Sequence, residues 1–361
     1  MKQALKNIFF AVIAIVIFFA LLEGGTRLAR WFKEDQMQSI GKKTLAFDVD
    51  DLNPYVFFRS LPSLELRPDD NYFYKFDEKE ITAKKTPEEY RIFVMGGSVA
   101  RGYGASAPEK KFYHIFERLL NENRPESITR RFNVISAGRL GYVSAQELIL
   151  LLMGVLDFHP DLVIHLNGFN DVLSFTQYKE LPGHPIYFQS LVKALKGVKA
   201  GQTVDRVSNR SAFFSEVKKM IQKYKTSSSS NSSINIARHY ERNMRHISQI
   251  LSANQIKGYL ILQPLIYDKK NKSQSEEKHI SQIGSARQIL LTSLQMFAES
   301  LALIGKEEDI HWGNFRGVFE DFSETVFVDT VHLNDKGQEI LARALWKEIK
   351  PIVYNELPAK D

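Results

Sequence analysis

The longest apolar stretch of the chain lies at its N-terminus, where fifteen apolar residues run without interruption from Ile8 to Leu22. A helix that crosses a membrane needs about twenty such residues, and the small and apolar residues on either side can extend this run. No small-residue cleavage pattern follows it, and the chain has no cysteine to carry a lipid. We therefore expect residues 1–30 to form an uncleaved signal anchor that spans the membrane once. A buried core helix is the alternative.

The side of the membrane on which the rest of the chain lies is a separate question. Lysines precede the apolar run and arginines follow it, so the basic residues alone do not decide the orientation. The signal-like layout favours a catalytic domain outside the cytoplasm, in a periplasm. The absence of cysteine is compatible with an oxidising compartment.

From residue 91 onward, apolar strand patterns alternate with amphipathic helix patterns. The strand patterns cover 91–97, 131–138, 161–168 and 257–266, and the helix patterns cover 109–123, 144–158, 239–254 and 335–353. Such alternation is typical of a parallel sheet covered by helices on both faces. We expect a three-layer α/β/α domain over residues 91–355, preceded by an aromatic-rich, membrane-proximal lead-in at 31–90. The chain of 361 residues, 44% of them hydrophobic, is long and apolar enough for such a core.

The alternation is broken by an insertion at about 176–236. Its segment 190–225 holds nine Lys or Arg against two acids, a local charge of +7 in a chain whose formal charge is +6. Residues 213–224 are compatible with an amphipathic helix, and the serine-rich segment 226–233 with a flexible linker. The basic segment is either a solvated lysine face or a surface that meets anionic lipid headgroups or an acidic polymer. The predicted anchor argues against nucleic acid as the partner.

A glycine-rich loop follows the strand pattern at 91–97, and it reads Met95-Gly-Gly-Ser-Val-Ala-Arg-Gly-Tyr-Gly104. Neither the phosphate-binding spacing G-x-x-x-x-G-K-[ST] nor the dinucleotide spacing G-x-G-x-x-G is present. Ser98 therefore stands as a bare turn residue or as a nucleophile. Near the C-terminus, Asp329 and His332 are three residues apart, close enough for the carboxylate to hold the imidazole. A serine hydroxyl needs such a pair to become a nucleophile.

Two further strand patterns end in residues that could stabilise an oxyanion. Gly141 offers a backbone N–H without an obstructing side chain, and Asn170 offers a side-chain amide. With the N–H of Ser98 itself they would give three donors, because the carboxyl ends of parallel strands meet at one edge of the sheet. Taken singly, Gly141 is also compatible with a packing glycine, Asn170 with a strand-end turn and Asp329 with an acid that binds backbone N–H groups.

These four short segments, in this order, resemble the four sequence blocks of the SGNH hydrolases, also called GDSL esterases or lipases. The resemblance covers about residues 91–350 and implies a flavodoxin-like fold with Ser98 as nucleophile, Gly141 and Asn170 in the oxyanion hole, His332 as base and Asp329 as the acid that orients it. The N-terminal anchor is similar to that of membrane-tethered bacterial members. One residue departs from the pattern, because Gly97 occupies the position of the usual aspartate of the G-D-S block.

Three functions are compatible with this sequence. The first is a serine esterase that removes acyl groups, acetyl among them, from a glycan or lipid of the cell envelope. The second is an O-acyltransferase that uses the same triad to modify an envelope polysaccharide. The third is a catalytically silent module that holds an acidic polymer, and the intact catalytic residues argue against it. We expect neither a metal nor a cofactor, because the other histidines lack metal-ligand spacing.

Overall fold

The structure is a computed structural model that describes residues 73–77, 79–177, 184–185, 229–280 and 286–355, together with eight residues between Lys6 and Gly24. The chain divides into two compact units, one of residues 1–49 and 189–229 and the other of residues 50–188 and 230–361. Of the predicted anchor only those eight residues are described, and they are helical. The lead-in up to residue 72 and the basic segment 190–225 lie outside the described residues.

The second unit is built on a five-stranded parallel sheet. Its strands are β3 (Glu89–Gly96), β4 (Arg131–Ser136), β5 (Leu162–Asn167), β6 (Lys257–Leu262) and β7 (His311–Asn314), and they lie side by side in the order β4-β3-β5-β6-β7. This is the 2-1-3-4-5 order of flavodoxin-like folds. Every residue of β5 is buried, as expected for a central strand that is covered on both faces. The predicted parallel sheet is confirmed.

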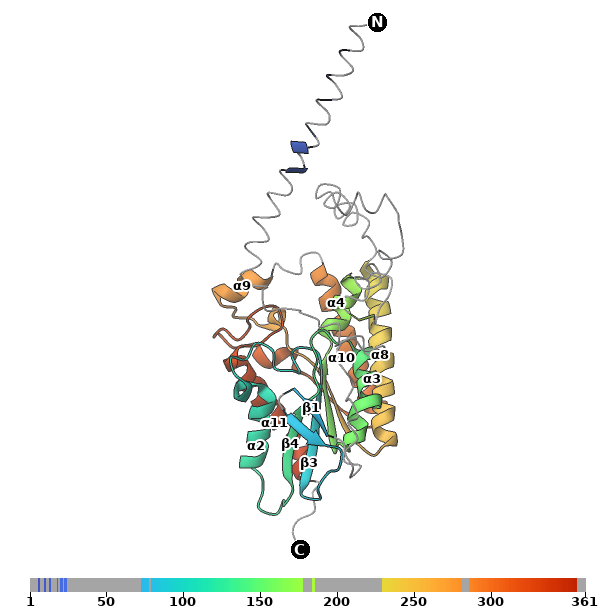
Figure 1. Ribbon diagram of the computed structural model, residues 1–361, viewed down its shortest axis with the longest axis vertical. Coiled ribbons are helices and arrows are strands. Elements are labelled where there is room, and N and C mark those ends of the chain that lie inside the picture. Colours follow the sequence, from blue (N-terminus) through green and yellow to red (C-terminus); the bar gives the residue numbers. More distant parts are fainter. Residues whose placement is uncertain are drawn as a thin grey trace. The chain divides into compact units, whose positions relative to one another are not determined.

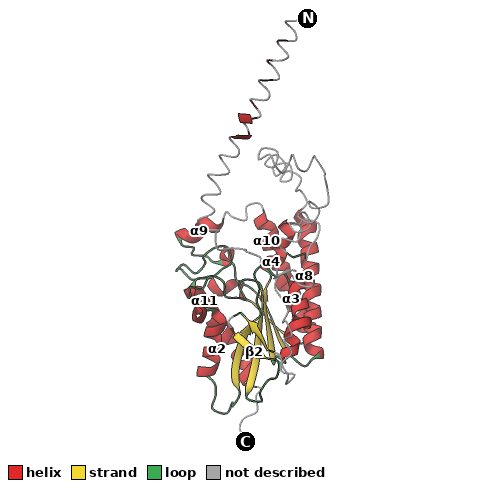
Figure 2. Ribbon diagram, viewed as in Figure 1, coloured by secondary structure: helices red, strands yellow, loops and turns green. Residues whose placement is uncertain are grey.

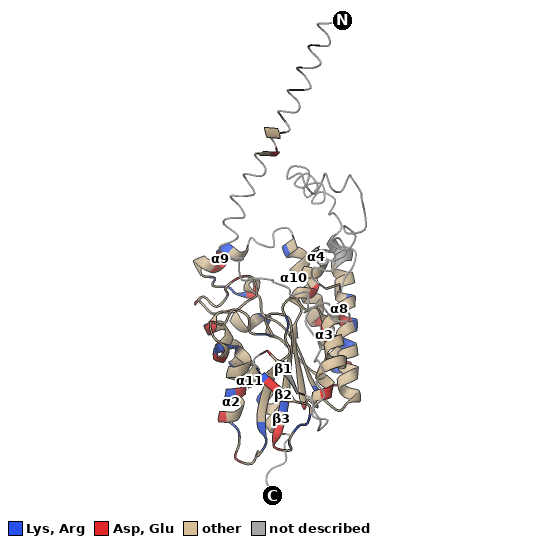
Figure 3. Ribbon diagram, in the orientation of Figure 1, with Lys and Arg blue, Asp and Glu red and all other residues tan. Residues whose placement is uncertain are grey.

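Helices cover both faces of this sheet, which makes the domain three layers thick (Figures 1 and 2). Helices α2 (Phe112–Glu122) and α11 (Asp335–Tyr354) pack together on one face, and α2 also contacts β4. On the other face lie α3 (Ser144–Leu150), α4 (Phe169–Gln177), α8 (Ser229–Ala253) and α10 (Arg287–Glu307). The charged residues of α8 are three arginines and one acid, Glu241 (Figure 3). The predicted three-layer α/β/α architecture is therefore confirmed.

Smaller elements complete the second unit. A hairpin of β1 (Phe73–Phe76) and β2 (Lys79–Thr82) precedes β3 within the predicted lead-in. Helix α3 continues as a π-helical turn at Leu151–Val155 and a 3-10 turn at Leu156–Phe158, so the helix pattern at 144–158 covers three kinds of helix. The short helix α9 (Gln274–Ile280) follows β6.

The structure corrects two local interpretations of the sequence. Residues 229–233, predicted as part of a flexible linker, form the first turns of α8, and Ser233 is buried there. Serine is well suited to a helix start because its hydroxyl can bond the free backbone N–H groups. The segment of His311 and Trp312 shows no strand pattern in the sequence, which predicts a loop there, but His311 begins β7, which pairs with β6 from Tyr259 onward. This edge strand is short and largely exposed, so it has no alternation of buried and exposed residues that would reveal it.

Among the described residues, α10 is the one helix that is long and apolar enough to cross a membrane. Its core-facing side is nevertheless packed inside the domain, because Leu294, Phe297 and Leu301 are buried and the Phe297 ring stacks on Tyr240 of α8 at 3.9 Å between centroids. These contacts are those of a core helix that covers the sheet.

Candidate active site

The structure brings Ser98, His332 and Asp329 into one hydrogen-bonded chain. Ser98 Oγ lies 2.6 Å from His332 Nε2, and His332 Nδ1 lies 2.5 Å from Asp329 Oδ2. Because a carboxylate only accepts hydrogen bonds, Nδ1 carries the hydrogen and Nε2 is left to accept the Ser98 hydroxyl. This is the arrangement in which an imidazole can take a proton from a serine.

Ser98 lies two residues beyond the carboxyl end of β3 and only 8% of it is exposed. A tight turn follows it, in which Tyr103 N donates to Ser98 O at 3.0 Å and Arg101 N donates to Gly97 O at 3.2 Å. The turn folds the chain back directly after the strand. The serine is therefore held at the edge of the sheet where ligands bind in parallel α/β folds.

The loop that carries His332 is fixed on several sides. Its Thr330 O accepts from Ile266 N, just beyond the end of β6, at 3.1 Å. The buried Glu276 of α9 accepts from Val326 N and Phe327 N at 2.9 and 3.1 Å and pairs with the buried Lys269. These contacts place the imidazole opposite a serine that precedes it by 234 residues.

Asp329 holds His332 through both of its carboxylate oxygens. Oδ2 faces the imidazole, while Oδ1 accepts from the backbone N–H groups of Val331 and His332, each at 2.9 Å. Burial by itself raises the pKa of Asp329, but the His332 side chain and the two backbone hydrogen bonds outweigh it and lower the pKa to about 2. Asp329 is therefore ionised at neutral pH and can stabilise an imidazolium.

Asn170, in the first turn of α4, lies beside the nucleophile loop. Its Nδ2 donates to Tyr142 O at 2.8 Å, which leaves the second amide hydrogen for another acceptor. The same Nδ2 lies so close to Gly97 that a Cβ atom at position 97 would come within 2.3 Å of it. The glycine that departs from the family pattern is therefore the residue that makes room for the Asn170 amide.

Gly141 precedes Tyr142 and adopts a backbone φ of +73°. This is the left-handed region, in which a residue with a side chain is strained. The Tyr142 carbonyl, which accepts a hydrogen bond from the Asn170 amide, belongs to the same turn. This turn therefore lies beside Asn170 and Gly97. The oxyanion role of the Gly141 N–H remains a prediction.

Sequence reasoning missed two features of the site. The Tyr103 ring lies 4.7 Å from the His332 ring, and 38% of Tyr103 is exposed at this edge of the sheet. Asp171, next to Asn170, is buried and binds Ser144 at the start of α3. Sequence spacing alone predicts neither contact. The sequence does show that Asp171 is next to Asn170 and that Tyr103 lies within the glycine-rich loop, and these positions could have pointed to both residues.

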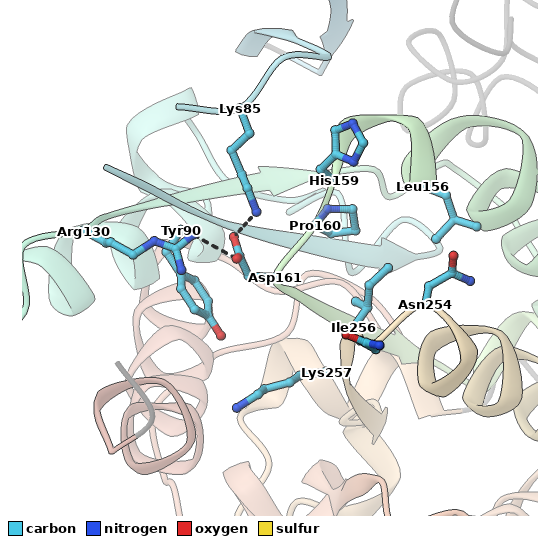
Figure 4. A pocket seen from close by; sticks show the side chains of 11 residues that line it. Lys85, Tyr90, Arg130, Leu156, His159, Pro160, Asp161, Asn254, Ile256 and Lys257 are labelled. Carbon is cyan, nitrogen blue, oxygen red and sulfur yellow. Dashed lines mark hydrogen bonds and ion pairs between the residues drawn. The ribbon is translucent and has the colours of Figure 1, made fainter. Parts of the chain in front are cut away.

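A cavity of about 490 Å³ lies at the other edge of the sheet, where the strands begin (Figure 4). Lys85 and Arg130 both pair with Asp161 there, each at 2.9 Å, and Lys257 also lines the cavity, so positive charges outnumber negative ones in its lining. This cavity is separate from Ser98, His332 and Asp329. Within the described ranges, no group of three or more His, Cys, Asp or Glu side chains could hold a metal ion.

Comparison with known proteins gives matches in structure alone. No family model matches the chain, and no curated protein matches it in sequence. Among solved structures, an acetyl xylan esterase is similar at 14% identity and a TM-score of 0.45, over 72% of this chain and 99% of that one. An acetylxylan esterase from Geobacillus stearothermophilus is similar at 16% and 0.44, over 73% and 96%. A protein assigned to the G-D-S-L lipolytic family from Desulfitobacterium hafniense is similar at 11% and 0.42, over 72% and 99%.

Proposed function

We propose that this protein is a serine esterase that removes acyl groups, acetyl among them, from a glycan or lipid of the cell envelope. The observation that carries the proposal is the continuous chain from Ser98 Oγ through His332 to Asp329, with contacts of 2.6 and 2.5 Å. It is supported by the Asn170 amide at the same edge of the sheet.

In the first half of the reaction, Ser98 Oγ attacks the carbonyl carbon of the ester while His332 Nε2 takes the hydroxyl proton. The tetrahedral oxyanion accepts hydrogen bonds from Asn170 Nδ2 and from the N–H groups of Ser98 and Gly141. Collapse of this intermediate breaks the bond to the alcohol oxygen, which receives the proton from His332. The products are a free alcohol and an acyl group on Ser98.

In the second half, water attacks the acyl carbonyl and gives a proton to His332. The second tetrahedral intermediate uses the same donors, and its collapse returns that proton to Ser98 Oγ and releases a carboxylic acid. An O-acyltransferase differs only here, because a sugar hydroxyl replaces water as the acceptor. The triad serves both reactions, so the acceptor has to be determined by experiment.

The envelope enters the proposal through the apolar run from Ile8 to Leu22. A single-pass anchor would hold the catalytic domain near the membrane, outside the cytoplasm, where acylated lipids and glycans are present. The basic segment 190–225 would add attraction to anionic headgroups or polymers at the same surface.

The test is hydrolysis of p-nitrophenyl acetate, butyrate and octanoate by the full-length protein in detergent. We expect turnover by the wild type and a loss of at least about a thousandfold in kcat for Ser98→Ala and His332→Ala. Ser252→Ala, which changes an exposed serine of α8, serves as the matched control and should keep wild-type activity. Equal inactivity of the wild type and both triad variants would refute the esterase.

The same assay separates water from a sugar as acceptor. A soluble sugar with free hydroxyls and no acetyl groups is added to p-nitrophenyl acetate, and the acetate released and the acetyl sugar formed are both quantified. An esterase releases acetate in proportion to the p-nitrophenol formed. Transfer of most acyl groups to the sugar would instead identify the acyltransferase.

A further inference from the structure

A buried polar contact joins the two elements that carry the predicted oxyanion donors. The Asp171 carboxylate, in the first turn of α4, accepts from Ser144 Oγ at 2.5 Å and from Ser144 N at 3.2 Å. Asn243 of α8 donates to the same Ser144 Oγ at 2.9 Å. All three residues are at most 4% exposed. The contact is therefore an internal tie between α3, α4 and α8.

Each end of this tie lies next to an oxyanion donor. Asp171 directly follows Asn170, and Ser144, the first residue of α3, follows the turn of Gly141 and Tyr142. The first N–H groups of a helix lack partners within the helix, and the Val143 side chain that precedes α3 cannot supply one. Asp171 supplies an acceptor there from another helix, where a carboxylate is also favoured by the helix dipole.

We propose that Asp171 is a positioning residue for the reaction at Ser98: by binding Ser144 it fixes the first turn of α4 against the start of α3, so that the Asn170 amide and the Gly141 N–H keep the spacing that an oxyanion needs. This inference rests on the proposed acyl chemistry. Asp171 itself does not touch the substrate, and its effect passes through its neighbours Asn170 and Ser144.

Burying an acid such as Asp171 costs free energy, so packing alone does not account for it. Burial raises its pKa, the hydrogen bonds from Ser144 lower it, and the nearby acid Glu147 raises it again, to about 7 in total. A core that needed only packing would be better served by an apolar side chain. Asp171 instead binds the start of α3 at hydrogen-bond distance, which is what a role in fixing local geometry requires.

The experiment compares Asp171→Ala, Ser144→Ala and Asp171→Asn in the full-length protein. We expect the two alanine variants to lower kcat for p-nitrophenyl acetate about 10- to 100-fold with KM changed less than about threefold, because a displaced oxyanion donor weakens transition-state binding alone. Asp171→Asn keeps a carbonyl oxygen for Ser144 and should recover to within about tenfold of the wild type. Phenylboronic acid, whose adduct with Ser98 is tetrahedral, should bind the alanine variants more weakly in parallel with kcat.

Asp161→Ala is the matched control, since Asp161 also accepts a backbone N–H, that of Arg91 at 2.7 Å, but at the opposite edge of the sheet. It should lower the melting temperature and leave kcat of the folded protein unchanged. A wild-type kcat in Asp171→Ala would overturn the proposal. So would a fall in kcat that comes with an equally large rise in KM and that Asp171→Asn does not reverse.

Labelling of Ser98 by a fluorophosphonate separates failure of this inference from failure of the esterase. A wild type that is labelled but hydrolyses no ester would refute the esterase, and the labelling rates of the Asp171 variants would still decide the positioning role, with slower labelling supporting it and equal labelling overturning it. A wild type that is neither labelled nor active would overturn both.

Discussion

At the scale of single residues, the site depends on the lack of a side chain at Gly97. The amide of Asn170 lies where a Cβ atom of residue 97 would be, at 2.3 Å, so the two positions are complementary. An aspartate in the same backbone conformation would push the amide away from the nucleophile. The departure from the G-D-S pattern is therefore matched by the structure around it.

We predict that Gly97→Asp, which restores the family pattern, lowers kcat about 10- to 1,000-fold, because it displaces one oxyanion donor. Gly97→Ala should show a smaller loss in the same direction. Steady-state kinetics on p-nitrophenyl acetate measure both, and a melting curve for each variant confirms that it is folded. An increase in kcat with aspartate would show that the amide is not displaced.

A second prediction concerns Asp329, whose pKa of about 2 keeps it ionised well below neutral pH. Asp329→Asn should lower kcat by about 10²- to 10⁴-fold, because an amide favours the wrong tautomer of His332 and cannot stabilise its imidazolium. Exchange of the exposed Asp321 for asparagine is the control and should have no effect. A loss in Asp329→Asn below about tenfold would exclude a catalytic role for this pair.

At the scale of elements, sequence pattern predicted the parts that are regular and amphipathic. Strands β3 to β6 and helices α2 and α11 follow from runs of apolar residues. Ser98 was found because it follows β3, and Asp329 and His332 because they precede α11. Helices α9 and α10 and the exposed strand β7 were not predicted. The contact of Asp171 with Ser144 was missed because it joins residues 27 apart through tertiary packing, which no local spacing encodes.

Helix α10 should contribute to stability as a core element. We predict that Phe297→Ala, which removes the ring stacked on Tyr240, lowers the free energy of unfolding by about 3 to 5 kcal/mol. Leu303→Ala on the same helix, where the side chain is 45% exposed, should cost much less. Urea unfolding followed by circular dichroism measures both. Equal costs would mean that α10 is not packed as described.

The raised pKa of Asp171 predicts how stability depends on pH. Because the native pKa is about 7 and the ordinary value is 3.8, Asp171 favours the folded state fully below about pH 4, and this contribution is lost as pH rises to about 7. Glu147, His165 and Tyr240 face the same interior, and burial raises the pKa of Tyr240 well above its ordinary value, so this phenol stays protonated over the range. As the pH rises from 4 to 7, the unfolding free energy of the wild type should therefore fall relative to that of Asp171→Asn. A difference that is independent of pH would contradict the raised pKa.

At the scale of the whole molecule, the predicted anchor would decide where the proposed esterase works. We predict that the full-length protein stays in the membrane pellet after washing with high salt and alkaline carbonate, because an apolar span is held by the bilayer interior. A variant that lacks residues 2–24 should move to the soluble fraction. Protease treatment of spheroplasts checks the orientation. Release of the full-length protein by carbonate would exclude a spanning anchor.

The distance along the chain between the two halves of the triad has a consequence for the timing of activity. Ser98 follows the first strand of the central sheet, whereas His332 comes 234 residues later, just before the last helix. During synthesis the serine emerges long before the base that activates it. If the proposed function is right, a nascent chain carries an unreactive hydroxyl until α11 has left the ribosome and docked, and acyl chemistry waits for that docking.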